Sequence, residues 1–179
     1  MEFCIKKYCI KSLSDVDLSF LAPMARRKLS ELDKIALCIM NECLSCAEDK
    51  NIKIVFASQY GEVGRLKKLV GQYSEENEVS PATFSASVHN SAVGQFSLIN
   101  KITKSYNSIS AEEFTFEAGL IEAILSAKNE EVLFCFCDSD LSQNARGFGC
   151  IISPCGQNNA VLKDGRLYCK INGVRECIF

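Results

Sequence analysis

Cysteine and histidine are the side chains of this chain whose spacing suggests chemistry, and the first such pair is Cys43-x-x-Cys46. A pair of this kind serves redox chemistry when it opens a helix after a strand, and binds zinc when about four ligands surround the metal. Here the pair lies near the end of a predicted helix, without proline or aromatic neighbours. We therefore favour packed or half-buried thiols over a redox or zinc site, and expect no metal and no cofactor.

The chain has eleven cysteines in all, a high and odd number. Cys135 and Cys137 point to one face of a predicted strand, where they are expected to pack rather than to bind a ligand. Several cysteines lie inside apolar runs, and no secretion signal is visible. Reduced thiols in a cytoplasmic protein are therefore favoured, and we expect no disulfide.

His89 is the single histidine, and it follows Ser87 and precedes Asn90. A pair of Ser87 or a cysteine with His89 would suit a small acyltransferase or thioesterase, which needs a nucleophile beside a base. The simpler interpretation, which we favour, is that Asn90 caps a helix and His89 bonds a backbone carbonyl. Gly61-x-x-Gly64 is too short for a phosphate-binding loop.

The bulk composition narrows the class of partner. The 179 residues favour one domain, 1–179, and carry 20 basic against 22 acidic side chains, a net charge of −2. Without a basic surplus, nucleic acid is not expected as a main partner. No apolar run approaches the roughly 20 residues that span a bilayer, so no membrane span is expected.

Hydrophobic spacing predicts alternating helices and strands. Helices are expected over 30–46, 61–71, 90–98 and 115–128, the first of them capped by Ser30. Strands are expected over 52–58, 108–111, 132–137 and 149–153, with an edge strand over 1–10 and a hairpin over 161–171 around Asp164-Gly165. An acidic loop is expected over 75–78. This alternation is typical of an α/β fold with one central sheet flanked by helices.

Four segments together resemble a known family. The most specific is Ser80-Pro81-x-x-Phe84-Ser85-x-Ser87-Val88-His89-Asn90-Ser91-Ala92-Val93-Gly94. The others are Arg26 to Ser30 with Lys34 to Leu37, Ala57 to Glu62, and Ser110 to Ala123. Over residues 20–155 the chain resembles the β-ketoacyl synthase-like N-terminal-domain family, found as chain-length-factor-like proteins in aryl polyene and similar type II polyketide systems.

The resemblance implies a thiolase-like fold, one half of a β-ketoacyl synthase, with a mixed central sheet. In active members a strand ends in a sharp turn that presents a cysteine at the start of a helix, where helix N–H groups lower the thiol pKa. That turn falls here at Phe114-Thr115-Phe116, which contains no cysteine. Active members also use two histidines from a C-terminal half. The resemblance therefore implies a catalytically silent protein rather than an enzyme.

Proteins that this chain resembles pair with an active ketosynthase and shape its acyl tunnel in polyketide or fatty-acid-type chain building. The resemblance assigns the pairing strand to Ser108-Ile109-Ser110-Ala111-Glu112-Glu113 and the tunnel wall to Phe114, Thr115 and Phe116. Supporting positions are Ser87, His89, Asn90, Gly94 and Phe96. We expect a heterodimer with a ketosynthase, with an acyl carrier protein as an indirect partner. An isolated chain is expected to form a homodimer, because an uncovered apolar edge invites pairing.

Overall fold

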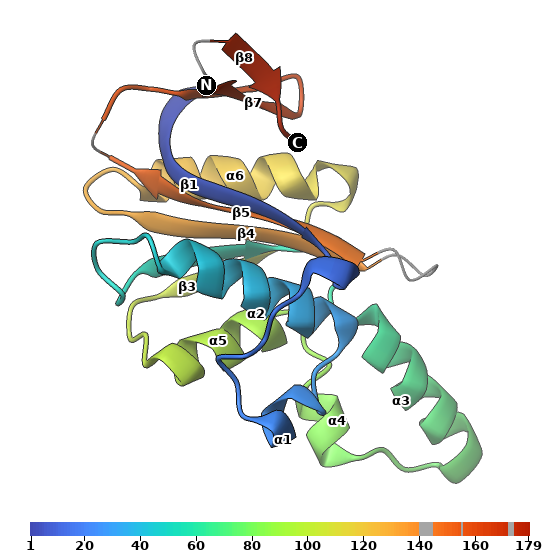
Figure 1. Ribbon diagram of the computed structural model, residues 1–179. Coiled ribbons are helices and arrows are strands. Elements are labelled where there is room, and N and C mark those ends of the chain that lie inside the picture. The colour runs from blue at the N-terminus through green and yellow to red at the C-terminus, as the bar shows by residue number, and fades with distance from the viewer. Residues whose placement is uncertain (140–144, 155, 172–173) are drawn as a thin grey trace.

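The computed structural model describes residues 1–139, 145–154, 156–171 and 174–179, and in this part of the chain eight strands form one sheet (Figure 1). The strands are β1 (Glu2–Ser12), β2 (Lys53–Ala57), β3 (Tyr106–Ile109), β4 (Val132–Ser139), β5 (Ala145–Ser153), β6 (Ala160–Lys163), β7 (Arg166–Ile171) and β8 (Val174–Cys177). The α-helices are α1 (Pro23–Arg26), α2 (Glu31–Leu44), α3 (Val63–Glu76), α4 (Pro81–Ser85), α5 (Ser91–Asn100) and α6 (Thr115–Ser126).

The strand order in the sheet is β3-β2-β4-β5-β1-β6-β7-β8. β2 runs parallel to both β3 and β4, and the other neighbouring strands are antiparallel, so the sheet is mixed. Helices flank it, and the predicted α/β class is confirmed. The expected edge strand over 1–10 is wrong: β1 lies inside the sheet, between β5 and β6. Its two partners come from the last third of the chain, and local spacing carries no sign of such distant pairing.

Helices α2 and α5 cover one face of the sheet (Figure 1). Ser30 caps α2 as predicted: its Oγ accepts the Asp33 N–H at 2.9 Å, and the Asp33 carboxylate accepts the Ser30 N–H at 3.2 Å. This reciprocal pair fixes the first turn of the helix. Within α2, Leu37, Ile39 and Met40 have no exposed surface. Burial of each such side chain contributes about 1.5–3 kcal/mol to folding.

Helix α6 lies on the opposite face, over β2 and β4. It packs closely because Gly119 has no side chain: a Cβ there would lie 2.6 Å from the Cβ of Ala57 and 3.0 Å from the Cε2 of Phe134. The sheet bends along β1, so that β7 lies beyond α6 in Figure 1. Leu162 and Leu167 of the C-terminal strands join the apolar cluster around α6. The helix is thus enclosed between two parts of one sheet.

Helices α3 and α4 project from the body of the molecule (Figure 1). Helix α3 extends beyond the predicted range 61–71, because Glu75 and Glu76, expected in an acidic loop, form its last turn. Asn77 then ends the helix with a φ of 55°. No helix in the described ranges is both long enough and apolar enough to cross a membrane.

Candidate functional site

The parallel strands β2, β3 and β4 end at the same edge of the sheet, and a network around Asp138 organises that edge. The Asp138 carboxylate accepts the Ser58 hydroxyl at 2.8 Å and the backbone N–H groups of Gln59 and Tyr60 at 3.1 Å. The Ser58 Oγ in turn accepts the Gly61 N–H at 2.8 Å. These bonds fix the turn from β2 to α3, in which Gly61 has a φ of 51°.

His89 joins this turn to β3. Its Nε2 lies 2.7 Å from the carbonyl oxygen of Ser58, and its Nδ1 lies 2.7 Å from the Oγ of Ser108. A carbonyl oxygen only accepts, so Nε2 carries a proton, and in the neutral ring Nδ1 accepts the Ser108 hydroxyl. The predicted bond from His89 to a backbone carbonyl is therefore present. Ser87 donates instead to the Phe84 carbonyl at 2.8 Å, so the structure does not bring Ser87 and His89 together as a hydrogen-bonded pair.

Thr115 closes the turn between β3 and α6. Its Oγ1 accepts the Ala111 N–H at 2.8 Å and donates to the Glu112 carbonyl at 2.6 Å. Glu112 has a φ of 50°, a left-handed conformation that costs a side-chain-bearing residue on the order of 1–3 kcal/mol. The sharpest point of the turn is thus Glu112, ahead of the predicted Phe114-Thr115-Phe116, and Thr115 is the first residue of α6.

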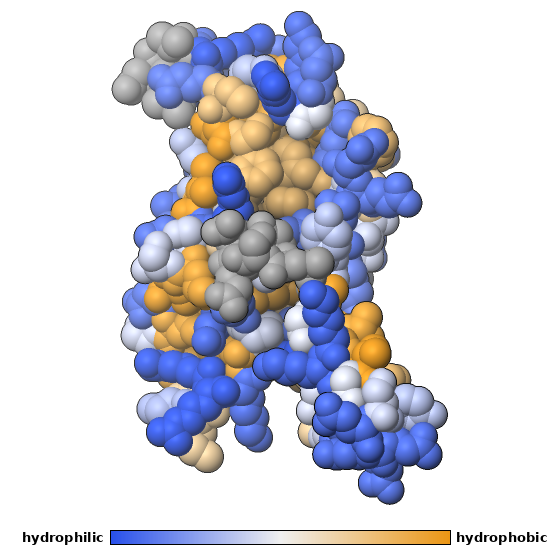
Figure 2. Space-filling view, turned by 90° about the vertical axis from the view of Figure 1, so that its right-hand side faces the viewer, coloured by the Kyte–Doolittle hydropathy of each residue, from blue (hydrophilic) through white to orange (hydrophobic). Residues whose placement is uncertain are grey.

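The two phenylalanines of this turn have opposite environments. Phe114 is 61% exposed, whereas Phe116 is 9% exposed. The Phe116 ring contacts Phe134, Phe136, Phe148 and Phe179, with ring centroids 4.5–5.9 Å apart. Figure 2 shows apolar side chains gathered on this side of the molecule, where α6 begins. Phe116 is thus packed at the start of α6.

The expected pairing strand is shorter than predicted. Only Ser108 and Ile109 lie in β3; Ser110 and Ala111 follow it, and Glu112–Phe114 form a 3₁₀ turn. The strand prediction overran because Glu112 turns the chain out of the extended conformation. Among the strands that the structure describes, β3 stands at one end of the sheet order and is hydrogen-bonded to β2 alone.

The backbone of β3 presents alternate residues to β2 and to the open edge. The carbonyls of Ser105 and Ile109 accept N–H groups of residues 54 and 58. In a parallel ladder the polar groups of alternate residues face the same neighbour. The N–H and C=O groups of Tyr106 and Ser108 therefore face away from β2, and so does the Ser110 N–H, which points opposite to the Ile109 carbonyl in the same peptide unit.

The remaining predicted residues support β3 from α5. Asn90 precedes α5, but its side chain does not cap the helix; its Nδ2 donates to the Tyr106 hydroxyl at 3.4 Å. A Cβ at Gly94 would lie 3.4 Å from that hydroxyl, so the glycine lets α5 approach β3. Phe96 is fully buried in the core beneath α5. Asn90 and Gly94 thus contact β3 through Tyr106.

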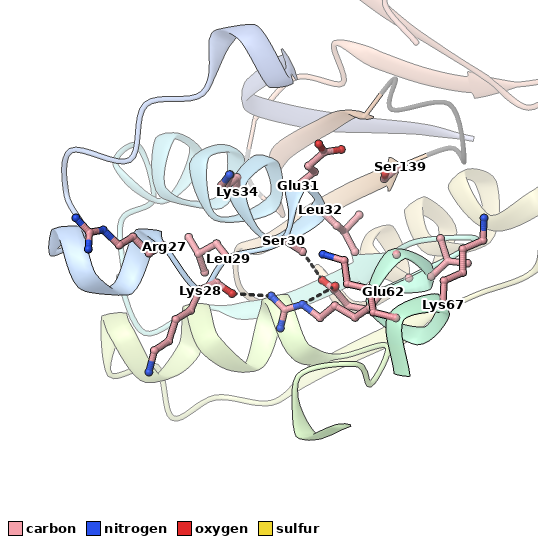
Figure 3. A pocket seen from close by; sticks show the side chains of 15 residues that line it. Arg27, Lys28, Leu29, Ser30, Glu31, Leu32, Lys34, Glu62, Lys67 and Ser139 are labelled. Atoms are coloured by element: carbon pink, nitrogen blue, oxygen red, sulfur yellow. Dashed lines mark hydrogen bonds and ion pairs between the residues drawn. The ribbon is translucent and has the colours of Figure 1, made fainter. Parts of the chain in front are cut away.

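A cavity of about 490 Å³ lies between the N-terminal ends of α2 and α3 (Figure 3). Its basic lining residues are Arg27, Lys28, Lys34, Arg65, Lys67 and Lys68. Figure 3 shows the side chains of Arg27, Lys28 and Lys67 pointing in different directions, so the positive charge is spread around the rim. Sequence reasoning missed this cavity, because its residues come from segments that become neighbours only on folding.

A buried ion cluster forms part of the wall of this cavity, which Ser30, Glu62 and Arg65 line. Arg65 pairs with Asp33 and, at 3.0 Å through its Nε, with Glu62. Glu62 also accepts the Ser30 hydroxyl at 2.7 Å. Burial and the adjacent Asp33 carboxylate raise the pKa of Glu62 to about 7, against the lowering effects of Ser30 and Arg65. Arg65 further donates to the carbonyls of Lys28 and Ala86, at 3.0 and 3.2 Å, so this cluster ties α3 to the body.

Neither of the cysteine pairs forms a metal centre with neighbouring groups. Among the described residues no set of three or more His, Cys, Asp or Glu side chains is arranged to hold a metal ion.

Asp138 and Ser58 were also missed by sequence reasoning. Their signal was available, since polar residues directly after buried parallel strands gather at one edge of a sheet.

The chain is similar to several known proteins. A family described as "Beta-ketoacyl synthase, N-terminal domain" matches residues 4–147. A solved structure of the ketosynthase ApeO in complex with its chain length factor ApeC, from Xenorhabdus doucetiae, matches with a TM-score of 0.77 and 19% identity. That match covers 90% of this chain and 82% of the other.

A second solved structure is AntDE:AntF, a type II polyketide-synthase acyl-carrier protein in complex with its ketosynthase bound to the hexaketide. It matches with a TM-score of 0.62 and 14% identity, over 78% of this chain and 52% of the other. No curated protein matches the sequence. At these identities the solved structures establish the fold, and the expected thiolase-like half of a β-ketoacyl synthase is confirmed.

Proposed function

The chain belongs to the β-ketoacyl synthase N-terminal-domain family, and from this premise we propose that it is a non-catalytic, chain-length-factor-like subunit. In this role it pairs with an active ketosynthase and shapes the tunnel that holds the growing acyl chain. The acyl carrier protein that delivers the chain is an indirect partner. The two similar structures support the proposal, since one holds a ketosynthase with its chain length factor and the other a ketosynthase with an acyl-carrier protein.

The turn before α6 is the observation that carries the proposal. Residues 110–116 contain no cysteine, and the two hydroxyls in that range are engaged with backbone groups. Ser110 donates to the Gln59 carbonyl at 3.2 Å, and Thr115 braces the turn itself. A condensing enzyme of this family needs a thiolate here, so these residues support a silent partner.

His89 also supports the proposal that the chain is a non-catalytic partner. A base must be free to take a proton from a reacting group. Both ring nitrogens of His89 are already within 2.7 Å of Ser58 and Ser108, where they brace β3. The chain has one histidine, so the histidine pair of active members cannot be assembled from its own residues.

The open edge of β3 supports the pairing. Backbone N–H and C=O groups on an uncovered edge are a template for a strand of another chain. Tyr106, Ser108 and Ser110 present such groups away from β2. Phe114, 61% exposed at the end of this edge, is available to line an apolar tunnel between subunits.

Intact-protein mass spectrometry tests catalytic silence. The purified chain is incubated with acyl-carrier and coenzyme A thioesters, beside an active ketosynthase as positive control. We expect an acyl adduct on the ketosynthase and none on this chain. A stable adduct on this chain would contradict the silent-partner proposal.

Co-purification tests the pairing. The chain is expressed with candidate ketosynthases from the same organism, and size-exclusion chromatography is expected to show a heterodimer. Ser110→Pro removes an outward-facing N–H while leaving the β2 ladder intact, and should weaken the complex. Ser110→Ala is the matched control, since it loses the hydroxyl but keeps the N–H. Equal loss in both variants, or no complex with any candidate, would count against pairing through β3.

A further inference from the structure

Two thiols from distant parts of the chain meet beneath α2. The Sγ of Cys9 on β1 lies 3.6 Å from the Sγ of Cys43 near the end of α2. Cys9 is 7% exposed, and Cys43 has no exposed surface. The two residues take no part in the turn before α6 or in the proposed pairing edge, so their contact has a separate significance.

Gly149 allows this contact. It is the residue of β5 directly opposite Cys9. A Cβ at Gly149 would press against the Cγ2 of Ile39 and lie 3.3 Å from the Sγ of Cys43. Because this position has no side chain, α2 settles onto the sheet and Cys43 comes to lie beside Cys9.

The pair singled out by sequence spacing, Cys43-x-x-Cys46, is divided between core and surface. Cys46 is exposed, and its Sγ lies 3.6 Å from the Oγ of Ser45. Cys43 faces the core in the same helix region. The close thiol neighbour of Cys43 is therefore Cys9, which is 34 residues away in sequence.

Cys135 and Cys137 form a second close pair, with Sγ atoms 3.7 Å apart, but their geometry is less suitable for a bond. They are alternate residues of one strand, and such Cα atoms lie about 6.6 Å apart, near the upper limit for a disulfide. Both are fully buried. Cys9 and Cys43 lie on separate elements, so small movements of either can close the gap.

We propose that Cys9 and Cys43 are an oxidisable dithiol, which closes to a disulfide between β1 and α2 when the protein meets a hydroperoxide. The Cys9 thiolate attacks the peroxide oxygen, the O–O bond breaks, and Cys9 becomes a sulfenic acid. The Cys43 sulfur then attacks the Cys9 sulfur; the S–S bond forms, the S–O bond breaks, and hydroxide leaves with the Cys43 proton as water. Two electrons from the two sulfurs reduce hydrogen peroxide to two waters.

The environments of the two thiols fit these roles. The hydrogen bond from Cys43 lowers the pKa of Cys9, against burial and the charge of Glu42. The pKa of Cys43 is raised, first by that same bond and then by burial. The more exposed thiol is thus the better thiolate, as the attacking partner requires. Without an oxidant, both remain reduced.

Peptide mapping tests the proposal on the folded, full-length chain. Reduced protein is treated with hydrogen peroxide, and its free thiols are then blocked with N-ethylmaleimide in denaturant. Trypsin places Cys9 in residues 8–11 and Cys43 in residues 35–50. We expect these peptides to be joined through Cys43 with the loss of two hydrogen atoms. Fully blocked Cys9 and Cys43, or a bond from Cys9 to Cys38 or Cys46, would overturn the proposal.

Two alanine variants separate the helix thiols. Cys43→Ala should lose the cross-link, and Cys46→Ala, three residues further along, should retain it. Circular dichroism checks that each variant folds, and the wild-type map stands without them. Oxidation in urea should spread over many cysteine pairs, because the native contact is lost. An unchanged Cys9–Cys43 yield in urea would mean that the fold does not direct the bond.

Discussion

The Nδ1 of His89 lies 2.7 Å from the Oγ of Ser108, while its Nε2 lies 2.7 Å from the carbonyl oxygen of Ser58. One imidazole therefore joins the ends of β2 and β3 to the segment that leads into α5. Its position is fixed from two sides, which suits a brace for the open edge. The same contacts leave no ring nitrogen free for proton transfer.

His89→Ala should lower the free energy of unfolding by about 2–3 kcal/mol, because it leaves the half-buried partners of two hydrogen bonds unsatisfied. Urea denaturation measures the change. Ser87→Ala is the control and should alter stability by less than about 0.5 kcal/mol, since its hydroxyl bonds only the Phe84 carbonyl near the surface. Similar losses in both variants would argue against the bracing role of His89.

Glu62 should make stability depend on pH near neutrality. Its pKa is raised from 4.5 to about 7 on folding, so the folded state holds the proton more tightly than the unfolded state. Its contribution is fully present below about pH 4.5 and is lost as the pH rises through 7. The full difference corresponds to about 3 kcal/mol.

Glu62→Gln should flatten this pH dependence between about pH 5 and 8, because glutamine does not titrate. Urea denaturation at several pH values measures the slope. Glu31→Gln, at the rim of the same cavity, is the control and should keep the wild-type slope. A wild-type slope in Glu62→Gln would show that another group is responsible.

Substitution of two helical glycines by alanine should change the stability of the protein in opposite directions. Gly119→Ala should lower the Tm, because its Cβ would lie 2.6 Å from that of Ala57; overpacking of this kind costs about 1–3 kcal/mol. Gly71 has open space around it, so Gly71→Ala should stabilise α3 by about 0.5–1 kcal/mol. Differential scanning calorimetry measures both. Stabilisation by Gly119→Ala would mean that α6 does not pack on β2 as described.

Alanine substitutions of Phe116 and Phe114 should have different effects, the first on stability and the second on the proposed partner function. Phe116→Ala should cost about 3–5 kcal/mol of unfolding free energy, because it opens a cavity among buried rings. Phe114→Ala should leave stability nearly unchanged, since the side chain is 61% exposed. In a complex with a ketosynthase, Phe114→Ala should change product length or affinity, measured by product mass spectrometry and size-exclusion chromatography. If Phe114→Ala changes neither product length nor affinity in that complex, Phe114 does not line the tunnel.

Elements with strong local signals were predictable from the sequence. The Ser30 cap and the apolar spacing after it predicted α2, and Asp164-Gly165, with φ values of 50° and 70°, predicted the hairpin of β6 and β7. The buried run 132–137 predicted β4 in the same way. In each case the residues that decide the structure lie within one turn or one strand of each other.

Features that depend on distant contacts were not predictable. The central place of β1 depends on β5 and β6, and the cavity depends on α2 meeting α3. The turn before α6 was located only approximately. Its sharpest point is Glu112 with a positive φ, and glutamate, unlike glycine or asparagine, gives no sequence signal for that conformation. The separation of Cys43 from Cys46 likewise follows from the direction in which α2 faces the sheet.

The place of β1 between β5 and β6 determines when this strand can pair during synthesis on the ribosome. β1 ends at Ser12, while its neighbour β5 begins at Ala145. At a synthesis rate of about 5–20 residues per second, β5 is made on the order of ten seconds after β1. During that time both edges of β1 are unpaired, so nascent molecules are exposed to aggregation, and folding after release is slowed by the high contact order. A chaperone that shields β1 during synthesis would raise the yield of folded protein more than one that acts afterwards.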